Sequence, residues 1–260
     1  MMKSRHLVNR VLPPALVVAV LIGACEAWVR LADVDPAVLA PPSRVATALV
    51  DTRGVLAGHT ATTLAETTLG LLIGAAIGVL IALLIASVPV ARRAIEPLLV
   101  VLQTIPPIVL APILVLALGF GWAPRIVVVV LTVFFPVAVA ATGGLLGADR
   151  DRIDLIRSFG GTHLDVLRHI TFPGAIPAVF DGLRVSAAYA VAAAAIAEQI
   201  GGARSGLGLY IARSQRSFRA DQVLAGVVVI ALLSLVVYGL VSVCAARAAP
   251  WHTPPTKEIA

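Results

Sequence analysis

Charged and polar side chains are concentrated in one stretch between long apolar sequences, Asp149 to Pro177. Its first part spaces Ile153 and Ile156 as on a helix, with charged residues on the other faces. Gly160-Gly161 would end that helix, and Thr162-His163-Leu164-Asp165 then matches a capping box, in which the Thr hydroxyl and the acidic side chain satisfy backbone amides. The chemistry that this pattern offers is binding. The stretch is either a solvated loop or a docking surface for a soluble partner, and we favour docking.

The capping box predicts a short helix from about His163 to Ile170, ending before Pro173. Leu164, Leu167 and Ile170 would form one apolar face. Because so short a helix is marginal alone, it must pack on something. A soluble partner is one candidate, and the chain's own membrane domain is the alternative.

A second polar group, Gln103-Thr104 followed by Pro106-Pro107, interrupts an apolar stretch. Proline removes a helical hydrogen bond, and membranes tolerate this where neighbours or a water-filled cavity satisfy the freed carbonyl. The group therefore indicates a helix that lines a translocation pathway, with a purely structural kink as the alternative. Glu198-Gln199, at the end of a later apolar stretch and before a glycine-rich turn, are further pathway candidates.

Catalytic motifs are absent from the sequence. It has no GxxxxGK[ST], HExxH or GxSxG pattern and no paired histidines, so we expect no ATPase site, catalytic residue or metal site in this chain. Cys25 and Cys244 have no metal-ligand spacing. Ile22 to Cys25 resembles a lipoprotein cleavage box, but the apolar run continues to Leu31, which favours an uncleaved first span.

The composition identifies a membrane protein. Of 260 residues, 59% are hydrophobic and 13% charged, against roughly 45–50% and about 25% in soluble domains. The net charge of +6 fits lysines and arginines collecting in cytoplasmic loops. Basic tracts with interleaved aromatics are missing, so nucleic acid is not an expected partner.

Six apolar stretches predict an all-α polytopic membrane protein with six transmembrane helices, at 11–31, 60–86, 95–119, 125–146, 183–200 and 223–246. We expect one transmembrane domain, 11–246, with cytoplasmic tails 1–10 and 247–260. The basic turn 87–94 and the loop containing 147–177 would be cytoplasmic, and a short helix should lie on the outer surface after an N-cap at Ser43.

The second span carries a stripe of small residues at every fourth position: Gly70, Gly74, Gly78, Ala82 and Ala86. Such a stripe lets another helix approach closely, although chance in a Gly/Ala-rich chain is an alternative. Glu66 lies only about a turn and a half into this span, so we expect it at the interface rather than buried. Four external arginines (Arg204, Arg213, Arg216 and Arg219) depart from the positive-inside rule. They indicate docking to an acidic surface or attraction of an anionic solute, unless they are tolerated noise.

The stretch resembles the EAA loop of permease subunits of binding-protein-dependent ABC importers. Gly160 and Pro173 have the spacing of that loop, and Gly182-Leu183-Arg184 follow. Further resemblance lies in Ile105-Pro106-Pro107, the Gly119/Gly121 turn and Gly206-Leu207-Gly208, and it is greatest to the nitrate/sulfonate/taurine branch. The Glu-Ala-Ala triplet itself is replaced by Asp154-Leu155-Ile156, which keeps only the acidic character.

The resemblance implies that this loop is a coupling helix between spans four and five that docks on a cytoplasmic ATP-binding subunit. The residues implied in the contact are Asp154, Gly160, Gly161, Thr162, His163, Leu164, Asp165, Leu167, Arg168 and Pro173, with Gly160 as hinge and Pro173 as stop. It also implies a bacterial inner-membrane protein with cytoplasmic termini that pairs with a second copy and an external solute-binding protein. ATP and Mg would be bound by the ATPase partner. A self-contained channel or secondary carrier remains the alternative, followed by a membrane enzyme or assembly factor.

Overall fold

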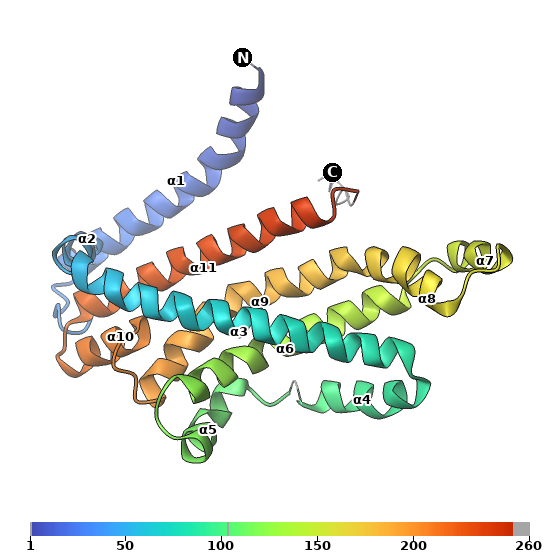
Figure 1. Ribbon diagram of the computed structural model, residues 1–260. Coiled ribbons are helices and arrows are strands. Elements are labelled where there is room, and N and C mark those ends of the chain that lie inside the picture. The colour runs from blue at the N-terminus through green and yellow to red at the C-terminus, as the bar shows by residue number, and fades with distance from the viewer. Residues whose placement is uncertain (1, 103, 252–260) are drawn as a thin grey trace.

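The computed structural model describes residues 2–102 and 104–251, which form a bundle of helices (Figure 1). The helices are α1 Met2–Leu31, α2 Pro42–Asp51, α3 Arg53–Ser87, α4 Pro89–Leu102, η1 Pro107–Leu110, α5 Ala111–Leu118, α6 Trp122–Leu146, α7 Arg150–Ser158, α8 His163–Val166, η2 Leu167–Thr171, α9 Phe172–Ile200, α10 Leu207–Arg216 and α11 Ala220–Ala248. The predicted all-helical chain is confirmed.

Within the described residues, four helical stretches are long and apolar enough to cross a membrane: α3, α6, α11 and the stretch His163–Ile200. The third predicted span, 95–119, is divided. Helix α4 ends at Leu102, and the shorter apolar helix Pro107–Leu118 follows. Pro106 has an extended conformation (φ −59°, ψ 122°), as expected for a residue that precedes a proline. Six spans remain a prediction.

Helices α3, α6 and α9 form the core. Valines of α6, among them Val129, Val133 and Val137, pack with alanines of α9 in the largest buried cluster. On α3, Gly70, Gly74 and Gly78 lie against α6, where a Cβ at Gly74 would be 2.8 Å from the Val130 carbonyl oxygen. Glycine therefore permits contact between the two backbones, as expected for helices that associate without a hydrophobic driving force.

The two ends of the bundle differ (Figure 1). Helices α7 and α8 project from one end, near the α3–α4 connection, whereas α2 and α10 lie at the other. Helices α1 and α11 both run away from the α2–α10 end towards the chain termini.

Two local expectations are wrong. The predicted basic turn 87–94 is largely helical, because α4 begins at Pro89, a residue suited to a first helical turn. Ser43 does not cap α2; the N-cap is Pro41 and no side chain caps it. Instead, Glu26 of α1 accepts hydrogen bonds from the Ser43 amide at 2.9 Å and from its hydroxyl at 2.8 Å, which ties α1 to the start of α2.

Candidate functional site

The charged segment begins with the capped helix α7. The Asp149 side chain accepts a hydrogen bond from the Asp151 amide at 3.0 Å. After α7, Gly160 has a positive φ of 80°, a conformation that costs glycine little. A Cβ at Gly161 would lie 2.8 Å from the Ile156 carbonyl oxygen. The two glycines therefore allow the chain to turn tightly against the end of α7.

The capping box at the start of α8 is formed. The Thr162 amide donates to Asp165 Oδ2 at 2.8 Å, and the Asp165 amide donates to Thr162 Oγ1 at 3.3 Å. The Thr162 hydroxyl also donates to Asp165 Oδ2 at 2.6 Å. Both groups are thereby fixed, so the start of α8 has a defined orientation.

Pro173 does not end the helix, contrary to the sequence-based expectation. Helix α8 continues through the π-helical turn Leu167–Thr171 into α9, and Pro173 lies in the first turn of α9. The Phe172 amide donates to the Leu167 carbonyl, five residues back. This wider turn shifts the hydrogen-bond register immediately before the proline, so its missing N–H interrupts no regular α-helical bond.

Apolar side chains are exposed along the charged segment. Leu155, Phe159 and Leu164 are 57%, 84% and 71% exposed, respectively. Leu167 and Ile170, predicted on the same face as Leu164, are half-buried. Asp154, His163 and Arg168 are exposed as well. The surface thus combines charge with exposed apolar side chains, and is suited to binding a partner.

The predicted pathway residues lie in different environments. Gln103 lies outside the described residues. Thr104 and Pro106 are exposed and Pro107 half-buried in the break between α4 and α5. Glu198 is 1% exposed, whereas its neighbour Gln199 is exposed. Glu198 therefore faces the interior of this chain.

Glu198 belongs to a buried polar cluster that holds the turn between α9 and α10. Its carboxylate accepts hydrogen bonds from Thr63 Oγ1 at 2.7 Å and from the Gly208 amide at 2.6 Å. His59 Nδ1 accepts one from the Gly206 amide at 2.8 Å. Side chains of α3 and α9 thus satisfy the amides at the start of α10, in the manner of a helix cap.

A second buried contact joins α3 to α6. The Glu66 carboxylate forms an ion pair with the Arg125 guanidinium, and the two side chains are 0% and 4% exposed. The expectation of an interfacial Glu66 is therefore wrong. Because the Arg125 guanidinium can reach the Glu66 carboxylate, the ion pair offsets the free-energy cost of burying that carboxylate.

The sequence matches a known family. Residues 74–249 match the inner membrane components of binding-protein-dependent transport systems. The chain belongs to this family. The resemblance to permease subunits of binding-protein-dependent importers is thereby confirmed.

Relatives of this permease have about its length. It is 32% identical to a probable ABC transporter permease protein of Haemophilus influenzae, over 88% of this chain and 93% of that protein. It is 28% identical to the taurine transport system permease protein TauC of Escherichia coli, over 90% and 87% of the two chains. It is 30% identical to the formylaminopyrimidine transport permease protein ThiX of Halalkalibacterium halodurans, over 93% and 96%.

The fold of the permease is also found among solved structures. A chain of the inward-facing MetNI methionine ABC transporter superposes with a TM-score of 0.66 at 19% identity, over 76% of this chain and 98% of that chain. At this identity the likeness concerns the fold alone.

Sequence reasoning missed Arg125, His59 and Thr63 as members of buried polar contacts. A signal was present, because ionisable residues within apolar spans usually pair with one another. Glu66 and Arg125 are such residues in the second and fourth predicted spans. Predicting that these two residues pair would have required knowledge of which spans pack together.

Proposed function

We propose that the chain is the permease subunit of an ABC importer in a bacterial inner membrane, with both termini cytoplasmic. Two copies would form a pathway, and an external binding protein would deliver the solute. A separate cytoplasmic subunit would bind ATP and Mg and hydrolyse ATP, while this chain binds no cofactor and catalyses no reaction itself. ATP-driven closure of two such subunits would switch the pathway between outward and inward access. Family membership supports the class, and the charged segment supports the coupling.

The observation that carries the proposal is the surface of α7 and α8. Leu155, Phe159 and Leu164 are exposed among charged residues at the projecting end of the bundle. Covering these side chains with a soluble partner would remove apolar surface from water. The capping box and the continuous connection through η2 to α9 provide a stiff link from that surface to the core. Movement of the partner would therefore move α9.

The charge distribution supports the orientation. Arg92 and Arg93 follow the α3–α4 connection, which lies at the same end as α7 and α8 (Figure 1). Arginines near span ends favour the cytoplasmic side. Because α1 and α11 run towards this side as well, the same orientation would leave both termini in the cytoplasm.

Relatives with named substrates support a small solute. These include permeases for taurine and, as a putative assignment in Bacillus subtilis, aliphatic sulfonates. Relatives for formylaminopyrimidine and riboflavin are also found. We propose a small solute, such as a sulfonate, taurine or nitrate.

Co-purification tests the proposal. The wild-type chain should retain the ATP-binding subunit encoded with it, and a Phe159→Asp/Leu164→Asp variant should lose it, because a charge in each contact prevents docking. Phe218→Asp is the matched control, since Phe218 is 77% exposed in the connection between α10 and α11, and α10 lies at the opposite end of the bundle (Figure 1). Size-exclusion profiles identify variants that fail to fold. Retention of the ATPase by a well-folded double variant would contradict the proposal, and solute flux through the chain alone would favour a channel or carrier.

A further inference from the structure

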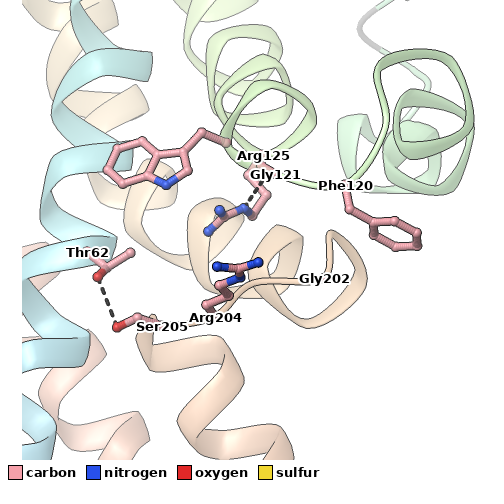
Figure 2. A pocket seen from close by; sticks show the side chains of 8 residues that line it. Thr62, Phe120, Gly121, Arg125, Gly202, Arg204 and Ser205 are labelled. Carbon is pink, nitrogen blue, oxygen red and sulfur yellow. Dashed lines mark hydrogen bonds between the residues drawn. The ribbon is translucent and has the colours of Figure 1, made fainter.

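A cavity of about 550 Å³ lies at the end of the bundle opposite α7 and α8. Its walls come from α3, the start of α6 and the connections α5–α6 and α9–α10 (Figure 2). It is lined by Thr62, Phe120, Gly121, Trp122, Arg125, Gly202, Arg204 and Ser205. The volume is within the range of small-molecule sites, about 300–1,000 Å³.

Both charged residues that line the cavity are arginines. The guanidinium groups of Arg125 and Arg204 point into the same space (Figure 2). Arg125 donates from Nε to the Gly121 carbonyl at 2.7 Å and from Nη1 to Glu66. Arg204 is exposed, and within the described residues it forms no ion pair. Two neighbouring cations repel each other, and an anion between them would relieve that repulsion.

The nearby carboxylates do not fill this role. Glu66 is fully buried and paired with Arg125, and it does not line the cavity. Glu198 is also buried, with its oxygens bonded to Thr63 and Gly208. The two arginines therefore present hydrogen-bond donors at the cavity surface, while the two carboxylates bind the helices and turns that surround it. Because Arg125 is 4% exposed and fixed by two partners, it is a pre-oriented part of this surface.

The remaining lining is aromatic and hydroxylic. The Arg125 Cζ atom lies 5.9 Å from the Trp122 ring centroid, which orients the guanidinium against the indole. Thr62 donates a hydrogen bond to Ser205 at 3.0 Å and so joins α3 to the α9–α10 connection beside Arg204. The Phe120 ring points away from the two guanidinium groups (Figure 2), so a ligand with an apolar body could contact Trp122 while its charged head reaches the arginines.

We propose that this cavity binds a small organic anion, with a sulfonate or carboxylate held by Arg204 and Arg125 and its apolar part against Trp122. Guanidinium groups match the oxygens of such heads in paired hydrogen bonds. That the anion is the transported solute rests on the proposed function. Inorganic sulfate has the charge but no apolar body and binds more weakly. Phosphate in a lipid headgroup shares the chemistry, and the experiment separates it.

Equilibrium binding of labelled benzenesulfonate to the purified full-length chain in phosphatidylcholine nanodiscs tests the proposal. The wild type should bind it more tightly than benzenesulfonamide, its uncharged analogue, and more tightly than sulfate. Arg204→Gln should weaken binding by about ten-fold or more, the size of one lost charge-assisted hydrogen bond. Arg216→Gln is the control, because Arg216 is an exposed external arginine outside the cavity. It should leave binding within about two-fold of wild type, a change below about 0.5 kcal/mol.

Equal binding by wild type and Arg204→Gln would overturn the proposal, as would equal affinity for the sulfonate and the sulfonamide, or no binding of either. Loss of benzenesulfonate binding when phosphatidylglycerol is added would assign the cavity to a lipid headgroup instead. The assay contains no ATP-binding subunit. If the wild-type chain does not retain the ATP-binding subunit but binds benzenesulfonate, the transport function is overturned and the anion site stands. If it retains the subunit but does not bind benzenesulfonate, only the anion site is overturned.

Discussion

The Glu66 carboxylate on α3 forms an ion pair with the Arg125 guanidinium on α6, in a part of the bundle where both side chains are almost fully buried. Arg125 also donates to the Gly121 carbonyl at 2.7 Å, and so fixes the turn before its own helix. One contact thus joins two core helices and one wall of the arginine-lined cavity. Its loss should affect both stability and the cavity.

Removing one member of this pair should destabilise the chain strongly. Glu66→Gln leaves Arg125 buried without a countercharge, and breaking a buried pair costs about 3–5 kcal/mol. The double variant Glu66→Gln/Arg125→Met should recover most of this loss, because no unpaired charge remains. Denaturant unfolding in mild detergent measures both. A single variant within about 1 kcal/mol of wild type would show that water reaches the pair.

Close packing between α3 and α6 gives a second prediction. In Gly74→Ala the new Cβ would lie 2.8 Å from the Val130 carbonyl oxygen, so the helices must separate, at about 1–3 kcal/mol. Gly58→Ala is the control on the same helix, because nothing lies within 4 Å of its Cβ position. That substitution should stabilise the helix by about 0.5–1 kcal/mol. Equal effects of the two substitutions in an unfolding assay would contradict the packing.

The stripe of small residues in α3 illustrates what a sequence can predict. Spacing alone placed Gly70, Gly74 and Gly78 on one face, and the structure puts that face against α6. The partner helix was not predictable, because many apolar helices could accept such a stripe. The same limit applies to Glu66, whose distance from the span end indicated the interface while the decisive fact was the position of Arg125.

The capping box at α8 should control the order of the charged segment. Thr162→Ala removes the acceptor of the Asp165 amide and should cost about 1 kcal/mol of local stability. Hydrogen exchange of the α8 amides should become several-fold faster, whereas Thr162→Ser, which keeps a hydroxyl, should exchange as wild type does. If the Ala and Ser variants exchange equally fast, the box does not stabilise the segment.

Glu198 should protect the α9–α10 connection from proteolysis. Its carboxylate accepts hydrogen bonds from Thr63 and Gly208, so Glu198→Ala frees the connection that contains Arg204. Trypsin should then cleave after Arg204 faster than in wild type, because the free energy of locally opening the connection is lower. Gln199→Ala is the control, since Gln199 is exposed beside it. Unchanged cleavage in Glu198→Ala would show that other contacts hold the turn.

Prolines were the residues whose effects were hardest to predict. Pro173 suggested a stop, yet the π-helical turn Leu167–Thr171 adapts the hydrogen bonds before it and the helix continues. Pro106 and Pro107 suggested a kink within one span, yet the chain is extended at Pro106 and two separate helices result. A proline in sequence marks a missing donor. Whether the chain bends, breaks or continues depends on the neighbours that satisfy the freed carbonyl.

ATP-driven uptake by the reconstituted transporter tests the central claim most directly. Proteoliposomes would contain this chain and the ATP-binding subunit encoded with it, with the neighbouring solute-binding protein and its co-purifying ligand outside. We predict uptake that requires ATP and all three proteins and is abolished by Phe159→Asp/Leu164→Asp. Uptake at the wild-type rate by the double variant, or without the ATP-binding subunit, would contradict the account.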